Sequence, residues 1–388
     1  MTVSLIDGVD GEGEQVCLFD FLSRTLSGRG EILSYKIQEH EDFSGFPQLG
    51  GGKSISYCEA GREVHPYYAK ADSHMREVEL IALPQATFLP NSHSVMASGS
   101  YLYSKSLDLS IPRSDLIDHI SMMEPSIRTD PRSGSWFDDS DLKCSDDVVL
   151  PICGPGFPNY GHFLYDGLPL AVLLRVNGYL DGRVKLVGRG LADWQKEILS
   201  RLGLVESYLE ITEPRKFRYI IASSMLWGHV PYPTRLIRPV FDLIRATVSR
   251  GKCSASKARV FITRGTNARR GISNISELAS LLKSHGFVTV NPYDVSLSNM
   301  IDIMSSARIV VGEGGAGMAN VGFCDPGAYV LELQPSNFID AWTRNTCRIM
   351  GLNWSVYLAR DDASVGQYEI DLSTFSSSLD QFLGLATQ

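Results

Sequence analysis

Apolar and polar residues follow different patterns in the two parts of this chain that meet near residue 148. Residues 78–111 hold short, partly alternating apolar runs broken by Pro, Asn and Gly, which predicts β-strands and hairpins. Residues 1–75 show no pattern that predicts particular elements. Residues 124–147 are polar and rich in Ser, Asp and Pro, and we expect an exposed loop or a domain boundary there.

From residue 148 onward, apolar runs of strand length alternate with runs in which apolar residues recur at helical spacing. One series extends to the helical stretch at 234–250, and a second begins at 258, after a small polar linker. Strands that alternate with helices build parallel βαβ units. The sequence therefore predicts an α/β protein with an N-terminal β-rich region and two Rossmann-like lobes, divided as 1–147, 148–250 and 251–388.

Glycines gather in the segment VVGEGGAGMAN at 310–320, directly after a predicted buried strand that ends at Gly312. Glycine lets a ligand come close to the backbone, and the free N–H groups of a helix that follows attract an anion. A phosphate group fits such a turn; the alternative is a tight turn needed only for packing. The GxGxxG pattern of a dinucleotide-binding fold is not matched.

Charged side chains are predicted near the carboxyl ends of two strands of the second series. Arg264 ends one strand, with Arg269 and Arg270 in the following loop, and arginine binds phosphate oxygens through planar, bidentate contacts. A solvated basic loop is the alternative. Glu332 lies near the end of a later strand, where its carboxylate could accept hydrogen bonds from a ribose diol or make only a local bond.

Three polar residues cluster at the start of a predicted helix in the first series. They are Asn159, His162 and Asp166, in the segment NYGHFLYDGLP. His162 and Asp166 are four residues apart and share one helical face. The cluster could bind sugar hydroxyls and supply a general base that deprotonates an acceptor. The alternative is structural, with His162 in a polar core and Asp166 serving the helix start.

Composition and charge exclude several classes of protein. The formal net charge of the 388 residues is −8, whereas non-specific nucleic-acid binding requires a basic surface. The seven cysteines form no CxxC motif, which argues against a disulfide framework or a zinc site. The sequence contains no apolar stretch of about 18 residues, so no transmembrane helix is predicted. The first residues do not resemble a signal peptide. We therefore expect a cytoplasmic enzyme.

Residues 258–335 resemble the C-terminal signature of glycosyltransferase family 61. That signature combines an arginine-bearing strand, a further arginine, an Asn and a Glu that open a helix, a Gly-Ala-Gly-x-x-Asn turn and a glutamate-bearing strand. The matching positions here are Arg264, Arg270, Asn274, Glu277, Gly286, Phe287, 315–320 and Glu332. The segment with Asn159, His162 and Asp166 is similar to the motif of the family's N-terminal lobe.

The resemblance implies a GT-B fold, in which two Rossmann-like lobes face a cleft. It also implies a nucleotide-sugar donor, here expected to be UDP-linked, inversion at the anomeric carbon, and no metal or other cofactor. Bacterial members are often linked to capsular or other surface polysaccharides, so the expected acceptor is a glycan or glycoconjugate. Peripheral membrane association and homo-oligomerisation stay open.

The residue patterns and the resemblance together predict roles for individual residues. Catalysis is expected from Asp166 and His162. The expected substrate-binding residues are Asn159, Arg264, Arg270, Asn274, Glu313, Gly314, Gly315, Ala316, Gly317, Asn320 and Glu332. Asn274 is further expected to cap its helix, with Glu277 three residues on.

One position departs from the family pattern. The family often has His before the Gly-Ala-Gly turn, but this chain has Gly314, preceded by Glu313. Glu313 could take over a polar role, the donor preference could differ, or activity could be lost. The main alternative function is therefore a non-catalytic nucleotide-sugar or glycan-binding protein of a polysaccharide assembly. A nicotinamide-dependent oxidoreductase is disfavoured because its fingerprint is missing.

Overall fold

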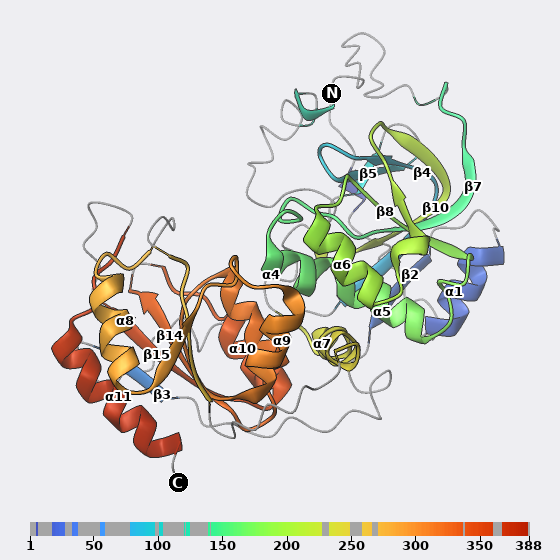
Figure 1. Cartoon of the computed structure of the whole chain (residues 1–388). Helices are drawn as coiled ribbons and strands as arrows, with labels where there is room; N and C mark the ends of the chain where they lie inside the picture. Colours follow the sequence, from blue (N-terminus) through green and yellow to red (C-terminus); the bar gives the residue numbers. More distant parts are fainter. Residues whose placement is uncertain are drawn as a thin grey trace. The chain divides into compact units, whose positions relative to one another are not determined.

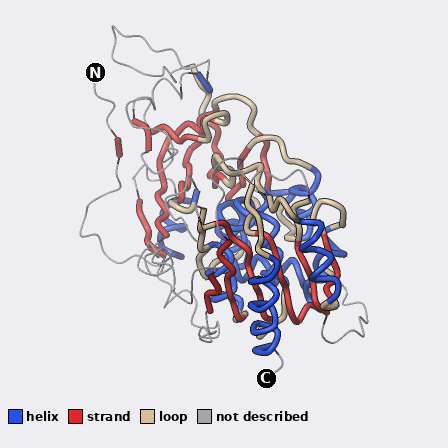
Figure 2. The backbone as a smooth tube through the Cα atoms, turned by 90° about the vertical axis from the view of Figure 1, so that its left-hand side faces the viewer, coloured by secondary structure: helices blue, strands red, loops and turns tan. Residues whose placement is uncertain are grey.

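The computed structural model describes two compact units, each built on one β-sheet (Figures 1 and 2). One unit comprises Met1–Gly45 and Arg76–Pro231, and the other Phe46–Met75 and Tyr232–Gln388. The described residues are 5–6, 18–27, 33–37, 55–58, 78–97, 101–103, 120, 122–124, 139, 141–226, 233–248, 258–265, 271–336, 338–359 and 367–386. No helix among them is both long and apolar enough to cross a membrane.

The sheet of the C-terminal unit is six-stranded and fully parallel, in the order β12-β11-β13-β14-β15-β3. Its strands are β11 (Ala258–Ile262), β12 (Phe287–Val290), β13 (Ala307–Glu313), β14 (Tyr329–Pro335), β15 (Asn353–Ala359) and β3 (Ile55–Cys58). The five strands after residue 250 confirm the predicted second series. β3 comes from a region in which the sequence predicted no element, and it pairs with β15.

Helices cover both faces of this sheet (Figure 1). They are α7 (Ile237–Ala246), α8 (Ile275–Ser284), α9 (Leu297–Ser306), the 3-10 helix η5 (Ala316–Phe323), α10 (Trp342–Met350) and α11 (Leu372–Ala386). Buried Leu278 and Leu282 of α8 and Phe375 of α11 belong to one apolar core with Tyr357 of β15. Burial on both faces explains why these strands read as nearly continuous apolar runs.

Helix α7 belongs to the C-terminal unit, whereas the sequence analysis placed it at the end of the preceding lobe. The units divide between Pro231 and Tyr232, and not at the linker of residues 251–257. The physical reason is packing: the rings of Phe241 and Phe323 lie 4.9 Å apart. No periodicity in the sequence reveals which neighbour an amphipathic helix will choose.

The sheet of the N-terminal unit is nine-stranded and mixed. Its parallel part is β10 (Arg215–Ser223), β7 (Ser145–Pro151), β8 (Val184–Gly188) and β9 (Tyr208–Glu210). The remaining strands are β4 (Val78–Leu89), β5 (Ser94–Ala97), β6 (Tyr101–Tyr103), β2 (Leu33–Ile37) and β1 (Leu5–Ile6). The strands predicted within 78–111 are confirmed, but they do not form a separate region, because β4 pairs antiparallel with β10 and extends the same sheet.

The helices of the N-terminal unit include one continuous run after β7. This run consists of α4 (Tyr160–His162), the π-helix η2 (Phe163–Gly167) and α5 (Leu168–Val176). The others with described bounds are α1 (Leu18–Ser27), α6 (Asp193–Arg201) and the 3-10 helix η3 (Val205–Ser207).

Part of the segment predicted as an exposed loop is buried. Glu124 is fully buried, and its carboxylate accepts hydrogen bonds from the backbone N–H groups of Asn91 at 2.6 Å and Ser92 at 2.8 Å. Residues 125–138 lie outside the described part of the chain. A single acidic residue in a polar stretch therefore anchors the β4–β5 turn, which polarity alone does not predict.

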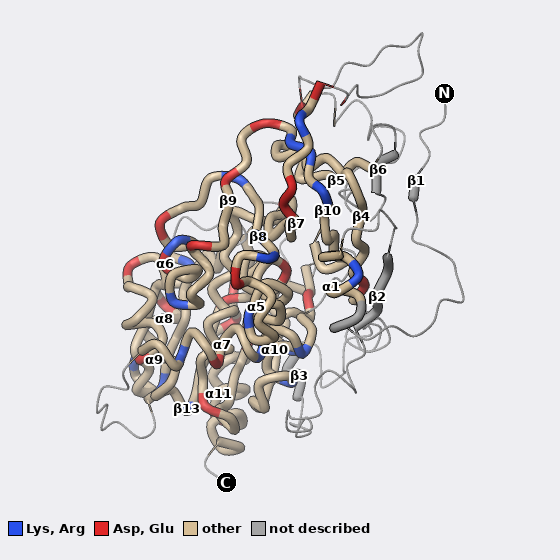
Figure 3. Tube along the Cα trace, turned by 90° about the vertical axis from the view of Figure 1, so that its right-hand side faces the viewer, with Lys and Arg blue, Asp and Glu red and all other residues tan. Residues whose placement is uncertain are grey.

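β7 carries acidic positions, its neighbour β10 carries basic ones, and α6 carries both (Figure 3). Lys216 pairs with Asp139 at 3.0 Å, and Lys185 with Asp147 at 2.8 Å. Such mixed pairs differ from the basic stripe that nucleic-acid-binding proteins present.

Candidate functional site

Each sheet contains one point at which the order of its strands reverses. In the N-terminal unit the chain runs from β7 to β8 and β9, and β10 then adds on the other side of β7. In the C-terminal unit it runs from β11 to β12, and β13 adds on the other side of β11. Open α/β sheets bind ligands beyond the carboxyl ends of the strands at such points. Both predicted polar clusters lie at these two places.

Three hydrogen bonds tie the end of β11 to the end of β13. The Thr263 hydroxyl and the Arg264 backbone N–H both donate to Oε1 of Glu313, at 2.7 and 2.8 Å. Nη1 of Arg264 donates to the carbonyl oxygen of Gly314 at 3.2 Å. The structure thus brings Arg264 and the glycine-rich turn together, as the sequence predicted.

Glycine is required where the turn meets this arginine. Gly315 has a φ of 138°, and a Cβ added to it would lie 3.2 Å from Nη1 of Arg264. L-residues with side chains rarely adopt that backbone conformation. Gly317 packs against Pro292: a Cβ added to Gly317 would lie 3.4 Å from Cγ of Pro292. The backbone from Gly314 to Gly317, with Ala316, is half-buried. It continues into the 3-10 helix η5, at the place where the sequence predicted a helix.

The departure at Gly314 has a steric consequence. A Cβ at this position would lie 3.2 Å from Cγ of Gln334 and 3.3 Å from the carbonyl oxygen of Leu333. The Gly314 N–H already donates to that oxygen at 2.9 Å. The histidine that the family often carries here would therefore require its neighbours to move.

Glu313 and Glu332 are both buried beneath the turn. Glu313 is 1% exposed, and its Oε2 has no hydrogen-bond partner among the described residues. Glu332 is fully buried; its carboxylate accepts from the Thr343 hydroxyl at 2.6 Å and from Nε1 of Trp354 at 3.1 Å. Burial, with the charge of Asp340, raises the pKa of Glu332 to about 8. This placement argues against the expected contact between Glu332 and a ribose.

Two further predicted substrate-binding residues make internal bonds. Asn320 is buried, and its Nδ2 donates to the carbonyl oxygen of Gly317 at 2.9 Å. Asn274 does not cap α8 with its side chain, so the capping prediction was wrong. Its amide donates to the carbonyl oxygen of Ile370 at 2.8 Å and accepts from the Ile370 N–H at 3.1 Å. Arg270 and its neighbour Arg269 lie outside the described residues.

In the N-terminal unit, the three predicted residues are together at the start of the helix after β7. Oδ1 of Asn159 accepts from the Gly161 N–H at 2.9 Å and caps the helix. Nδ1 of His162 lies 2.7 Å from Oδ2 of Asp166, and the two side chains are 41% and 19% exposed. Because an ionised carboxylate only accepts, Nδ1 carries the hydrogen and Nε2 is the ring nitrogen that can take up a proton.

Local geometry fixes this pair. Asp166 lies in the π-helical turn, a feature that is frequent at functional sites. A Cβ added to Gly156 would lie 2.5 Å from the His162 ring, so glycine is needed for the ring to pack there. Burial raises the pKa of Asp166 to about 6, although the hydrogen bond from His162 acts in the opposite direction. The carboxylate and the imidazole thus form an oriented acid–base pair.

Residues 160–331 match a family model described as Glycosyltransferase 61. The chain carries a glycosyltransferase family 61 domain. The match contains His162, Asp166, Arg264 and the glycine-rich turn, and so spans the switch points of both sheets. It makes residues 160–331 a glycosyltransferase domain. No curated protein sequence matches the chain.

Solved structures with some likeness to this chain include two glycosyltransferases. One is the bacterial iron-containing dodecameric glycosyltransferase TibC from enterotoxigenic E. coli H10407, with 13% identity and a TM-score of 0.30, over 50% of this chain and 59% of that one. The other is the E. coli heptosyltransferase WaaC with ADP, with 9% identity and a TM-score of 0.34, over 62% of this chain and 99% of that one. The alignment thus spans less than two thirds of TibC. Likenesses at this level carry no argument about substrate.

The strands and helices themselves confirm the α/β class and the two Rossmann-like units expected of this glycosyltransferase. The cleft between the lobes stays a prediction. Sequence reasoning missed Thr263, Gly156 and Pro292 as parts of the sites. The motif GPGFPN, with its closely spaced Gly and Pro, was the signal for Gly156. No sequence pattern indicated Thr263, because its role depends on a partner 50 residues away.

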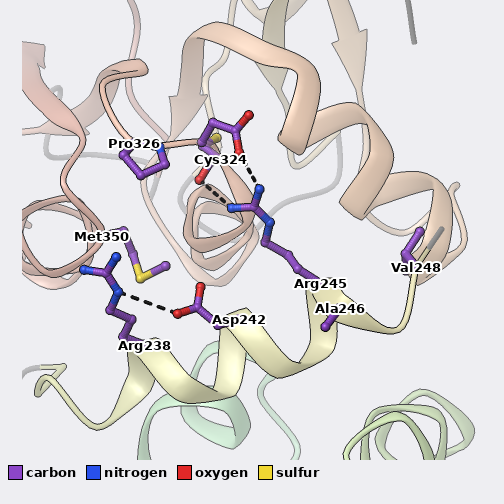
Figure 4. A pocket seen from close by; sticks show the side chains of 9 residues that line it. Arg238, Asp242, Arg245, Ala246, Val248, Cys324, Pro326 and Met350 are labelled. Atoms are coloured by element: carbon purple, nitrogen blue, oxygen red, sulfur yellow. Dashed lines mark hydrogen bonds and ion pairs between the residues drawn. The ribbon is translucent and has the colours of Figure 1, made fainter. Parts of the chain in front are cut away.

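A cavity of about 470 Å³ in the C-terminal unit is separate from the glycine-rich turn. Figure 4 shows Arg245 reaching from α7 to the loop at Cys324, where its guanidinium donates to the Cys324 carbonyl oxygen at 3.2 Å and pairs with Asp325. This loop precedes β14 and so lies at the amino edge of the sheet, opposite the carboxyl edge that holds Arg264. The cavity is therefore not the donor site of the family 61 domain.

Proposed function

We propose that this glycosyltransferase is an inverting, metal-independent enzyme that uses a nucleotide-sugar donor, UDP-linked, in the synthesis of a surface polysaccharide. The acceptor is a hydroxyl of a glycan or glycoconjugate. The observation that carries the proposal is the contact between the Arg264 guanidinium and the Gly314–Gly315 backbone at the strand-order reversal. A cation beside the backbone N–H groups of a glycine-rich turn is the arrangement that binds a diphosphate.

The C-terminal unit holds the donor in this proposal. Arg264 and the backbone N–H groups at Gly315 and Ala316 face the two phosphates and stabilise the negative charge that develops on the leaving diphosphate. The three hydrogen bonds between the ends of β11 and β13 hold both the backbone and the guanidinium of Arg264 in place. In this proposal no backbone group has to reorganise during the reaction, which favours electrostatic stabilisation of the transition state.

The N-terminal unit supplies the general base. Nε2 of His162 takes the proton of the acceptor hydroxyl, while Asp166 keeps the hydrogen on Nδ1 and stabilises the imidazolium that forms. The acceptor oxygen forms a bond to the anomeric carbon as the bond from that carbon to the diphosphate oxygen breaks. A single displacement inverts the anomeric configuration and releases the nucleoside diphosphate.

The test is a donor panel with the full chain. UDP-, CDP-, GDP- and ADP-sugars are incubated with the protein, and slow hydrolysis of the donor is followed by release of the nucleoside diphosphate. We expect turnover of UDP-sugars that EDTA leaves unchanged. Binding of a donor without any turnover would favour the non-catalytic alternative, and turnover that requires added Mg²⁺ or Mn²⁺ would contradict metal independence.

A further inference from the structure

The loop after β12 presents one aromatic ring to solvent beside the glycine-rich turn. Tyr293 is 86% exposed. Its backbone N–H donates to Oδ1 of Asn291 at 3.1 Å, and the Asp294 N–H donates to the Asn291 carbonyl oxygen at 3.0 Å. Pro292 fixes one backbone torsion between them. The tyrosine is therefore held on a short, internally bonded turn and not on a loose loop.

This turn adjoins the site of the proposed diphosphate. Pro292 packs 3.4 Å from the place of a Cβ on Gly317, and Nδ2 of Asn291 lies 3.7 Å from the place of a Cβ on Gly265. Gly265 follows Arg264 directly, so the loops after β12, β11 and β13 form one continuous edge. Neighbouring strands lie about 4.8 Å apart, which places the end of β12 roughly 10 Å from the end of β13, two strands along the sheet. A ribose separates a base from its diphosphate on that scale.

We propose that Tyr293 is a stacking platform for the nucleobase of the donor. The inference rests on the proposed nucleotide-sugar function and adds the position of the base. A large aromatic ring exposed at the rim of a phosphate site gains from stacking, because every nucleobase has a π-face. The loop on the opposite flank, after β14, also carries an aromatic ring, Phe338, but that side chain is 48% exposed, against 86% for Tyr293.

The experiment is calorimetry on the full chain with UDP and with inorganic pyrophosphate as probes. Tyr293→Ala should weaken UDP about 5- to 150-fold, the range typical of a lost base–aromatic stack, and should leave pyrophosphate affinity unchanged. Tyr293→Phe keeps the ring and should bind UDP like the wild type. Val288→Ala is the matched control, since Val288 is 64% exposed on β12, the strand that precedes the Tyr293 loop.

The remaining outcomes test the stacking role of Tyr293 and the proposed nucleotide-sugar function separately. Equal UDP affinity in Tyr293→Ala and wild type overturns the stacking role and leaves the proposed function standing. Equal weakening of UDP and pyrophosphate also overturns it, because the residue would then act on the phosphates or on the fold. If the wild type binds none of UDP, CDP, GDP and ADP, the proposed function itself fails.

Discussion

The two units place carboxylates at the carboxyl edges of their sheets in opposite environments. In the N-terminal unit, Asp166 is paired with a half-exposed histidine. In the C-terminal unit, Glu332 is fully buried, and Thr343 and Trp354 donate to its oxygens. A half-exposed pair can exchange a proton with a bound hydroxyl, whereas a buried carboxyl with internal partners fixes the surrounding strands.

The comparison shows that a perturbed pKa does not by itself identify a reactive group. Burial raises the pKa of Asp166 to about 6 and that of Glu332 to about 8, so the larger shift belongs to the group with no access to substrate. Structural groups perturb pKa values as active sites do. The two carboxyl groups differ in the exposure of their partners: the His162 side chain beside Asp166 is half-exposed, whereas Thr343, which donates to Glu332, is buried.

The largest expected effect is on the exposed pair. His162→Ala should lower transfer about 10²- to 10⁴-fold, because general-base assistance contributes that much. UDP affinity by calorimetry should stay within about twofold of wild type, because His162 belongs to the other unit from Arg264. The rate of transfer should also fall in Asp166→Asn. Wild-type turnover in both variants would show that neither His162 nor Asp166 acts as the general base.

Next in size is the donor site of the C-terminal unit. Arg264→Ala should weaken UDP about 10- to 100-fold, the worth of hydrogen bonds to a charged group, as measured by calorimetry. Arg308→Ala is the matched control, since Arg308 lies at the amino end of β13 and donates to the Gly327 carbonyl oxygen at 2.8 Å. Equal affinities in the two variants would reject the phosphate role of Arg264.

Local patterns in the sequence predicted most of the regular elements. The alternation of apolar runs identified β11 to β15, and the spacing of His162 and Asp166 predicted their contact, because both features depend on neighbours in sequence. The turn at Gly315 and its approach to Arg264 were also predictable, since parallel strands end at one edge.

Contacts between distant segments were not predictable. β3 pairs with β15 across about 300 residues of chain, and Asn274 bonds to Ile370 instead of capping its own helix. Glu332 reads as an accessible strand-end acid, yet Thr343 and Trp354 enclose it. In each case a tertiary partner outcompetes the local option, and a single sequence does not show which partner that is.

A smaller effect should appear in the pH profile of transfer. The pKa of Asp166 is about 6, so the carboxylate that supports the His162 imidazolium is protonated as the pH falls through that value. We expect kcat/KM to decline about tenfold per pH unit below it. Asp166→Asn should change the pH at which this limb appears, and a limb at the same pH in that variant would assign the titration to another group.

The smallest effect is on stability, and it concerns the buried carboxyl. The pKa of Glu332 is about 8 in the folded chain, against an ordinary value of 4.5. The neutral form is thus favoured by folding, so its contribution to stability is full below 4.5 and is lost as the pH rises toward 8. Glu332→Gln is neutral throughout, and its amide can donate to Thr343 and accept from Trp354.

The melting temperature of Glu332→Gln relative to wild type should therefore rise between pH 5 and pH 8. The rise should be several degrees, because about 1 kcal/mol shifts the midpoint by roughly 2–4 °C in a domain of this size. UDP affinity should stay within about twofold of wild type, since a fully buried side chain does not touch the donor. A parallel pH dependence in both proteins, together with a large loss of UDP binding, would make Glu332 a ligand-binding residue and erase the contrast with Asp166.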